Sequence, residues 1–223
     1  ELEDQYLPYK PKRKTKATVA IEKGLEPLAR FIYEQVPGEK TIVALASEFI
    51  GEEKGVATAE QAMEGAMHII AEWVSENADY RKGLREMMQK DGVVSSRVLK
   101  GKEGEKSKFE MYYEFKEPVS AIPSHRMLAI RRGAEEEVLT FSIEMDEAKP
   151  LGYLQKQVIK DVKSPFAPYL EKAVKDSYAR LLNPAIQTEV RLALKKRADE
   201  EAIKVFEENM KNLLLSPPAG PIS

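Results

Sequence analysis

Hydrophobic side chains recur at three- and four-residue intervals over much of this 223-residue chain, which predicts amphipathic α-helices. The clearest pattern follows Thr58, whose spacing from Gln61 predicts a capping box at a helix start. The apolar positions on one face of this helix are Met63, Ala66, Met67, Ile70, Trp73 and Val74. A second helix, expected to end near Gly92, repeats the pattern with Tyr80, Leu84, Met87 and Met88. We expect the two helices to pack closely across a short turn.

Between residues 93 and 145 the pattern changes to the two-residue period of a half-buried strand. The alternating apolar positions are Leu139, Phe141, Ile143 and Met145. We expect residues 93–99 to pair with this strand in a small antiparallel ribbon. Ser124 is predicted to be the N-cap of a short helix that ends at Gly133.

The last third of the chain returns to a helical period. Asn183 and Pro184 predict an N-cap followed by proline at the first helical position, so a new helix is expected to start there. Its apolar positions continue for about eight turns. They are Ile186, Val190, Leu194, Ala198, Ala202, Val205, Phe206, Met210 and Leu213.

These patterns predict a mainly α fold, a multi-helix module with a small antiparallel β ribbon and a long C-terminal helix. We expect a helical lobe over residues 1–92, a small α/β insertion over 93–149 and a helical region over 150–216 with the long helix as its spine. The proline-rich residues 217–223 are interpreted as a linker to a missing domain. Because the chain also starts at Glu1 without a methionine, we interpret it as a fragment.

Composition narrows the possible functions. With 43% hydrophobic and 32% charged residues, the chain can form a packed interior and an ionised surface. It contains no cysteine, which excludes disulfides and thiolate catalysis and favours the cytoplasm. No apolar run approaches the roughly 20 residues needed to span a bilayer. The net charge is only −2, so any attraction for nucleic acid must come from a local cluster.

One such cluster lies in "YLPYKPKRKTKAT", residues 6–18, where two prolines favour an extended connection. Its cations are Lys10, Lys12, Arg13, Lys14 and Lys16. They are suited to contacts with nucleic-acid phosphates, but a solvated loop or a contact with a protein partner is also compatible with the pattern. A second, looser cluster around Arg97 is diluted by Glu103 and Glu105.

Motifs for catalysis or cofactor binding are weak. The stretch "GKEGEKS", residues 101–107, has a glutamate where a phosphate-binding loop needs glycine before lysine, so we expect a charged turn. His68 lacks the second histidine of a helical zinc motif, and His125 beside Ser124 does not make a nucleophile and base. We expect no enzyme activity, no cofactor and no metal site.

Four blocks in this order resemble the bacterial Tex family of transcription accessory proteins. They are "LEDQYLPYKPKRKTKAT" (residues 2–18), "EKGLEPLA" (22–29), "SRVLKGKEGEKSKFEMYYEFKEPVSAIPSHRMLAIRRG" (96–133) and "DEEAIKVFEENMKNLLLSPPAGP" (199–221). The resemblance implies a central helical region that lacks the family's RNase-H-like domain, helix-hairpin-helix units and C-terminal oligonucleotide-binding domain.

The resemblance implies nucleic acid, RNA or DNA, as the partner of the parent protein, possible contact with the transcription machinery, and no membrane. The candidate nucleic-acid-binding residues are Lys10, Lys12, Arg13, Lys14 and Lys16, with Arg97, His125 and Arg126 as weaker candidates. A helical scaffold that contributes phosphate contacts is the first hypothesis. The alternative is a structural or protein-interaction module with no nucleic-acid affinity of its own.

Overall fold

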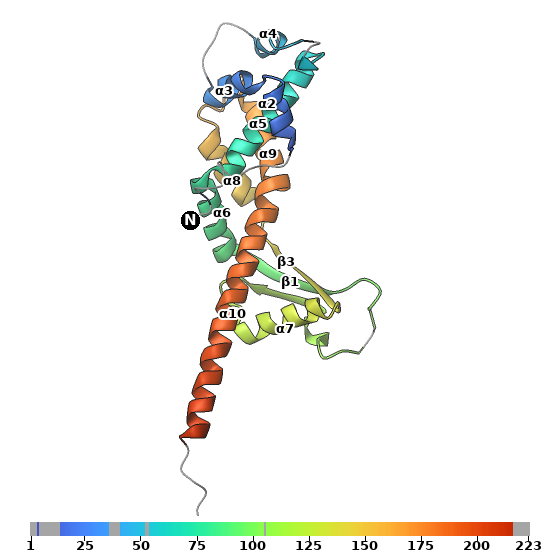
Figure 1. Ribbon diagram of the computed structural model, residues 1–223, viewed down its shortest axis with the longest axis vertical. Coiled ribbons are helices and arrows are strands. Elements are labelled where there is room, and N and C mark those ends of the chain that lie inside the picture. Colours follow the sequence, from blue (N-terminus) through green and yellow to red (C-terminus); the bar gives the residue numbers. More distant parts are fainter. Residues whose placement is uncertain (1–3, 5–13, 36–40, 52–53, 105, 216–223) are drawn as a thin grey trace, which may run out of the picture. The chain divides into compact units, whose positions relative to one another are not determined.

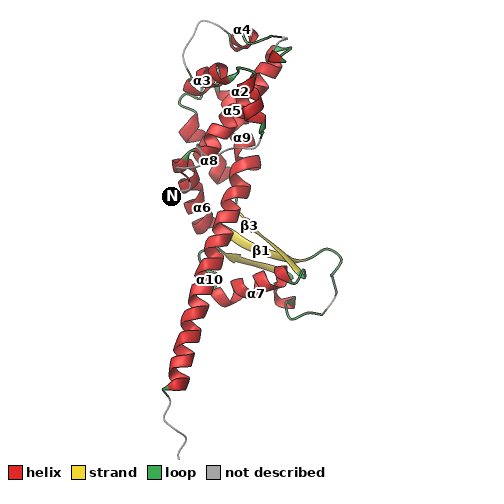
Figure 2. Cartoon of the chain, viewed as in Figure 1, coloured by secondary structure: helices red, strands yellow, loops and turns green. Residues whose placement is uncertain are grey.

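The computed structural model of the chain describes residues 4, 14–35, 41–51, 54–104 and 106–215 (Figure 1). The chain divides into two compact units: unit 1 comprises residues 1–86 and 146–186, and unit 2 comprises residues 87–145 and 187–223. Helices dominate, a small antiparallel sheet is present, and the C-terminal helix is long, which confirms the predicted fold class (Figure 2). Each unit is built from two separate stretches of chain, whereas the sequence predicted consecutive segments, and the predicted region 150–216 is divided after Ile186.

Unit 1 is helical and is organised around one long helix, α5. Its elements are α2 (Lys16–Glu22), α3 (Glu26–Glu34), α4 (Ile42–Ser47), α5 (Ala59–Glu76), most of α6 (Ala78–Asp91), α8 (Ala148–Val158) and α9 (Ala167–Asp176). Because α2, α3, α4 and α9 all contact α5, its buried face is wider than the predicted stripe and includes Ile69 and Ala71. The apolar period therefore identified the helix correctly but underestimated its burial.

Threonine side chains set the starts of three helices in unit 1, namely α2, α4 and α5. The Oγ1 of Thr15 accepts the Thr18 N–H at 3.1 Å, and Thr18 Oγ1 accepts the Thr15 N–H at 2.7 Å, so α2 has a complete capping box. Thr58 Oγ1 accepts the Gln61 N–H at 3.2 Å, as predicted for α5. The carboxamide oxygen of Gln61, however, accepts the N–H of Ala57.

A π-helical segment, η4 (Ser177–Leu182), joins α9 to α10 (Asn183–Leu214) without a break. The α-helix does begin at Asn183 as predicted, but Asn183 is not an N-cap, since its φ of −58° and ψ of −48° are helical. Proline removes an N–H and crowds the carbonyl four residues earlier in a regular α-helix. The wider hydrogen-bond spacing of a π-helix just before Pro184 accommodates this proline inside a continuous helical run.

Ser177, in this π-helical segment, is fully buried, and its hydroxyl donates to the Ala71 carbonyl of α5 at 2.7 Å. We expect Ser177→Ala to lower the free energy of unfolding by about 1 kcal/mol, because a buried hydrogen bond is lost. Urea denaturation followed by the fluorescence of Trp73, which lies in α5, measures the change. Ser47→Ala is the control, since the Ser47 hydroxyl bonds Val43 on an exposed surface. Equal losses in both variants would contradict the assignment.

Unit 2 contains a three-stranded antiparallel sheet in the order β2-β1-β3. The central strand β1 (Val93–Val98) pairs with β3 (Leu139–Glu144), with Val93 opposite Glu144 and Val98 opposite Leu139. This confirms the predicted ribbon. The edge strand β2 (Glu114–Pro118) was not predicted, because Phe115 is its only large apolar side chain.

Helix α7 (Ser124–Glu135) packs on this sheet next to β3 (Figure 1). The N-cap is Pro123 with extended backbone, so the prediction that Ser124 caps the helix was wrong. The Ser124 hydroxyl instead donates to the carboxylate of Glu201 in α10. The helix also passes the predicted end at Gly133 and stops at Glu135.

A further expectation from the sequence concerns the membrane. None of the helices in the described ranges is long and apolar enough to cross a membrane.

Candidate nucleic-acid interface

The residues nominated from the sequence fall in different parts of the structure. Lys10, Lys12 and Arg13 lie outside the described residues. Lys14 and Lys16 are in unit 1, while Arg97, His125 and Arg126 are in unit 2. Lys14 and Lys16 are therefore the two members of the basic stretch that lie among the described residues.

A groove of about 530 Å³ between α2 and α5 brings these two lysines together with a third, Lys23. Lys16 opens α2, and Lys23 is its C-cap residue. The apolar residues that line the groove are Val19, Ala20 and Leu25. The groove therefore has three lysines around it, and Ala20 and Leu25 are buried beneath its surface.

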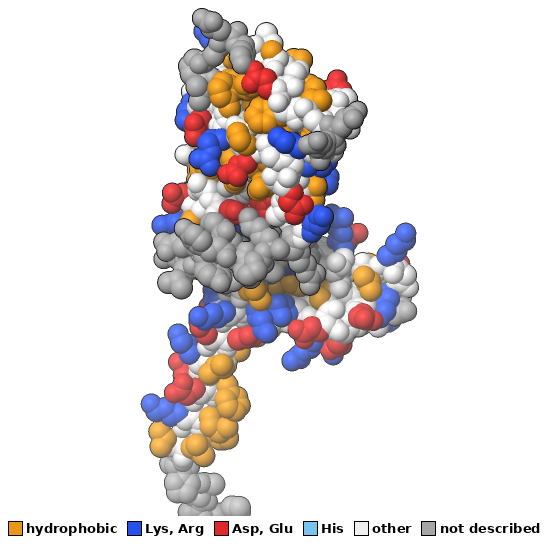
Figure 3. All heavy atoms as spheres, turned by 45° about the horizontal axis from the view of Figure 1, so that its top comes forward, with side chains coloured by type: hydrophobic (Ala, Val, Ile, Leu, Met, Phe, Trp, Pro, Cys, Tyr) orange, Lys and Arg blue, Asp and Glu red, His pale blue; other side chains and the backbone are white. Residues whose placement is uncertain are grey.

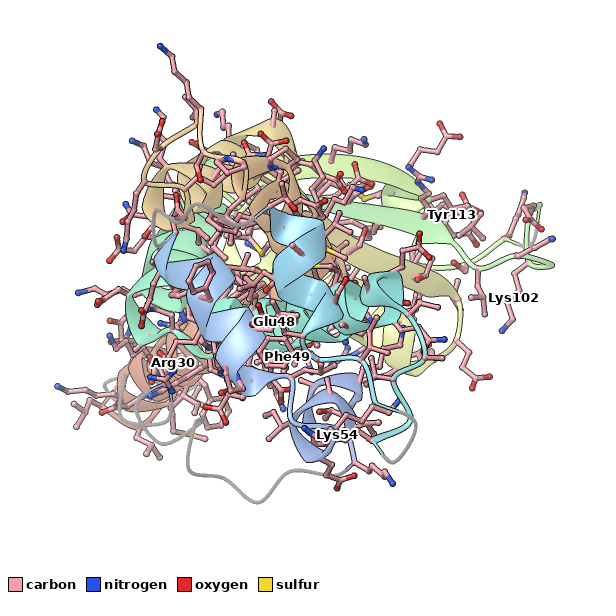
Figure 4. The ribbon with its side chains drawn as sticks, turned by 90° about the horizontal axis from the view of Figure 1, so that it is seen from above. Arg30, Glu48, Phe49, Lys54, Lys102 and Tyr113 are labelled. Carbon is pink, nitrogen blue, oxygen red and sulfur yellow. The ribbon has the colours of Figure 1, made fainter. Side chains whose placement is uncertain are left out.

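Two tight turns add a fourth lysine near the groove. Gly24 and Gly55 have φ values of 76° and 65°, which glycine adopts without strain. The Lys23 ammonium donates to the Gly55 carbonyl at 3.0 Å, so it bridges the two turns. The Lys54 ammonium lies close to the Gly24 turn, because a Cβ added to Gly24 would be 3.7 Å from its Nζ (Figure 4). Sequence reasoning missed Lys23 and Lys54, which only folding brings together.

Carboxylates offset part of this positive charge. Glu22 lies 3.9 Å from Lys14, but both side chains are well exposed, so water and salt screen the pair. Glu64 lines the groove and lies 3.6 Å from the Nε2 of His68. Two further carboxylates lie close by, since Glu72 accepts from Thr15 Oγ1 at 3.1 Å and Asp176 interacts with Lys16. Among the residues that line the groove itself, three lysines accompany one carboxylate, which favours an anionic ligand.

The carboxylate of Asp4 forms its ion pairs with two arginines of α6. Arg81 Nε donates to Oδ1 at 2.9 Å, and Arg85 Nη2 donates to Oδ2 at 2.8 Å. Burial raises the pKa of Asp4, but the hydrogen bonds from Arg85 and Arg81 outweigh it and hold the pKa below its usual value. Asp4 is therefore a charged anchor of unit 1.

Arg97 lies on β1 and shares the counter-ion Glu144 with Lys116 of β2. Its guanidinium is 3.5 Å from Glu144, whose other carboxylate oxygen accepts from Lys116 at 2.8 Å. The Lys116 hydrogen bond is the main reason that the pKa of Glu144 lies below its usual value. The Arg97 charge is thus partly neutralised, although its side chain is exposed.

The two remaining candidates have other surroundings. Arg126 donates to Glu117 Oε1 at 2.9 Å and so ties α7 to β2. His125 is exposed and lines a second groove, between α7 and α10. The contact with Glu117 ties Arg126 into the fold. His125 lines a different, mostly apolar groove from the one that the lysines line.

Comparison with known proteins shows which family this chain resembles. A family profile described as "Tex central region-like" matches residues 39–206. The uncharacterized protein YdcI of Bacillus subtilis is 46% identical over 219 residues, covering 98% of this chain and 30% of that protein. The chain belongs to the Tex family.

Other Tex relatives carry functional names. The transcriptional accessory protein Tex of Neisseria gonorrhoeae is 35% identical over 224 residues, covering 98% of this chain and 29% of that protein. The human S1 RNA-binding domain-containing protein 1 is 30% identical over 241 residues, covering 98% of this chain and 23% of that protein. These matches confirm the Tex resemblance. The chain spans less than a third of the length of each relative.

Proposed function

We propose that this chain is the helical scaffold of a nucleic-acid-binding transcription accessory factor of the Tex family, and that unit 1 contributes phosphate contacts. The observation that supports the proposal is the groove between α2 and α5, where Lys14, Lys16 and Lys23 meet. The names of two relatives also support this proposal. One is a transcriptional accessory protein, and the other is an S1 RNA-binding domain-containing protein. The role is one of placement and contact, without catalysis.

The chemistry of the groove suits phosphate groups of a nucleic acid. Lysine ammonium groups bind phosphates as point charges and release condensed counter-ions, so affinity falls steeply with salt. Such contacts carry no sequence specificity and position a strand rather than read it.

We expect the triple variant Lys14→Gln, Lys16→Gln, Lys54→Gln to bind a 20-nucleotide single-stranded RNA at least tenfold more weakly at low salt. Three lost phosphate contacts should also reduce the slope of log K against log salt by about 2. Fluorescence anisotropy at a series of salt concentrations measures both quantities, and a duplex DNA of the same length tests the preference. Lys23 stays unchanged, because it also holds the Gly55 turn.

The matched control replaces three exposed lysines of unit 1 that do not line the groove, Lys82, Lys163 and Lys172, by glutamine. It removes the same charge from the chain. Equal weakening in both triple variants would assign the effect to overall charge and would contradict a groove-specific contact.

A second candidate function is a structural or protein-interaction module without nucleic-acid affinity of its own. The observation that favours it is the pairing of Arg97 with Glu144 and of Arg126 with Glu117 in unit 2, on a chain of net charge −2. The same titration distinguishes the two candidates. Absence of salt-dependent binding by the unmodified chain supports the second and removes the first.

A further inference from the structure

The last half of α10 carries an apolar side that no described part of the chain covers. Ala198 is fully buried, but every residue from 201 to 215 is exposed. Phe206 is 64% exposed, which is unusual for a phenylalanine. The other large apolar side chains in this stretch are Ile203, Val205, Met210, Leu213, Leu214 and Leu215. Figure 3 shows hydrophobic side chains gathered along one side of this helix end and charged ones along the other.

Part of this apolar side forms one wall of a groove of about 470 Å³ in unit 2. Ala202, Val205 and Phe206 come from α10, and the start of α7 supplies the opposite wall with Pro123 and Leu128. The lining is therefore mostly apolar, unlike the lysine-rich groove of unit 1.

Hydrogen bonds connect α10 to the start of α7 and to the residues just before it. The Ser124 hydroxyl donates to the carboxylate of Glu201 at the edge of the groove. One turn earlier on α10, Arg197 donates to the Ile122 carbonyl at 2.7 Å. A groove held this way is preformed, so a ligand does not have to order it on binding.

The charges around the groove indicate the chemistry of the occupant. Between residues 199 and 211, α10 carries five acidic residues and two lysines. Glu201 and Glu208 are seven residues apart and therefore lie on one side of the helix, next to the groove lined by Val205. An apolar groove with an acidic border is complementary to an apolar segment with basic flanks.

A second copy of this chain is a poorer occupant. A coiled-coil seam would use Ile203, Phe206, Met210 and Leu213, which amount to two heptads, fewer than the three or four that indicate a coiled coil. Pairing two such helix ends would also bring two acid-rich borders together.

We propose that the groove between α7 and α10 docks an amphipathic helix of a partner protein, with bulky aliphatic or aromatic side chains on one face and lysine or arginine on the flanks. Phe206 and Val205 contact the apolar face, and Glu201 and Glu208 face the basic flanks. This is the helix-in-groove mode of recognition, and it is independent of phosphate binding by unit 1.

Two synthetic 18-residue helical peptides test the proposal. Both carry leucine on one face at helical spacing, and the other positions are lysine in one peptide and glutamate in the other. We expect the labelled leucine–lysine peptide to bind the intact chain at least tenfold more tightly than the leucine–glutamate peptide, as measured by fluorescence anisotropy. Phe206→Glu should weaken binding of the leucine–lysine peptide at least tenfold, even though the added negative charge alone would strengthen it.

Val162→Glu is the matched control, since it places the same charge at a side chain of unit 1 that is 79% exposed. It should bind the peptide like the unmodified chain. Unchanged circular dichroism melting would show that Phe206→Glu remains folded, as its exposure leads us to expect. Equal affinity for both peptides, or unchanged binding by Phe206→Glu, would overturn the proposal. A dimer seen by sedimentation equilibrium that Phe206→Glu abolishes would also overturn it, because the occupant would then be a second copy.

Discussion

Replacing Asp4 by asparagine is expected to lower the free energy of unfolding of unit 1 by about 3 kcal/mol. The Asp4 carboxylate is nearly buried and accepts hydrogen bonds from both Arg81 and Arg85. The amide of asparagine would leave two guanidinium groups, one of them buried, without their shared counter-ion. Removing one partner of a buried ionic cluster is costly for this reason. Urea denaturation followed by Trp73 fluorescence measures the loss.

Glu26→Gln is the control for this prediction. Glu26 pairs with Arg30 at 3.2 Å on the exposed surface of α3, where such a pair contributes about 0.3 to 0.5 kcal/mol. A loss of similar size in both variants would mean that the Asp4 cluster behaves as a surface pair.

The same cluster predicts a dependence of stability on pH. The folded-state pKa of Asp4 is lowered, so its contribution is present above the unfolded-state value of about 4 and is lost as pH falls through the folded-state pKa. The difference between the unmodified chain and Asp4→Asn should therefore be largest near neutral pH and shrink under acid conditions. Denaturation at several pH values checks the direction, and a difference that grows with acid would contradict it.

Gly133→Ala is expected to destabilise unit 2 by about 2 kcal/mol, although alanine favours helices over glycine. Gly133 lies within α7, and a Cβ there would be 2.6 Å from Leu139 Cδ1 and 3.2 Å from Phe109 Cγ. Both neighbours are buried and have little room to move. The steric cost should outweigh a propensity gain of about 1 kcal/mol. Hydrogen exchange of the amides in β1 and β3 reports the stability of this unit.

Gly152→Ala, a glycine replacement in another helix, is expected to raise stability instead of lowering it. Gly152 lies within α8, and an added Cβ would meet no atom within 4 Å. This variant should be stabilised by about 0.5 to 1 kcal/mol through helix propensity alone. If both glycine variants changed stability in the same direction, packing at Gly133 would not be the deciding factor.

Helices with a strong apolar period could be predicted from the sequence, but the residues at which they begin and end were predicted less often. Thr58 caps α5 through a residue three positions away, so the signal is local. The Ser124 hydroxyl binds Glu201 across 77 positions, a contact that no local pattern contains. The Asn183–Pro184 pair has the composition of a helix start, but the π-helical segment before it keeps the run continuous.

The candidate site shows the same division between local and long-range information. Lys14 and Lys16 are visible as part of a charge run in the sequence. Lys23 and Lys54 join them only because two glycine turns face each other in the folded chain. Arg97 and Arg126 were nominated for their charge, and the structure gives each a glutamate partner.

The interleaved order of the two units has a consequence for biosynthesis. Helix α5 contacts α9, so the core of unit 1 closes only after residue 176 has left the ribosome, by which time residues 87–145 have already emerged. The strands of unit 2 are thus synthesised before α9 can cover the apolar surface of α5. The nascent chain therefore carries two incomplete cores during this interval.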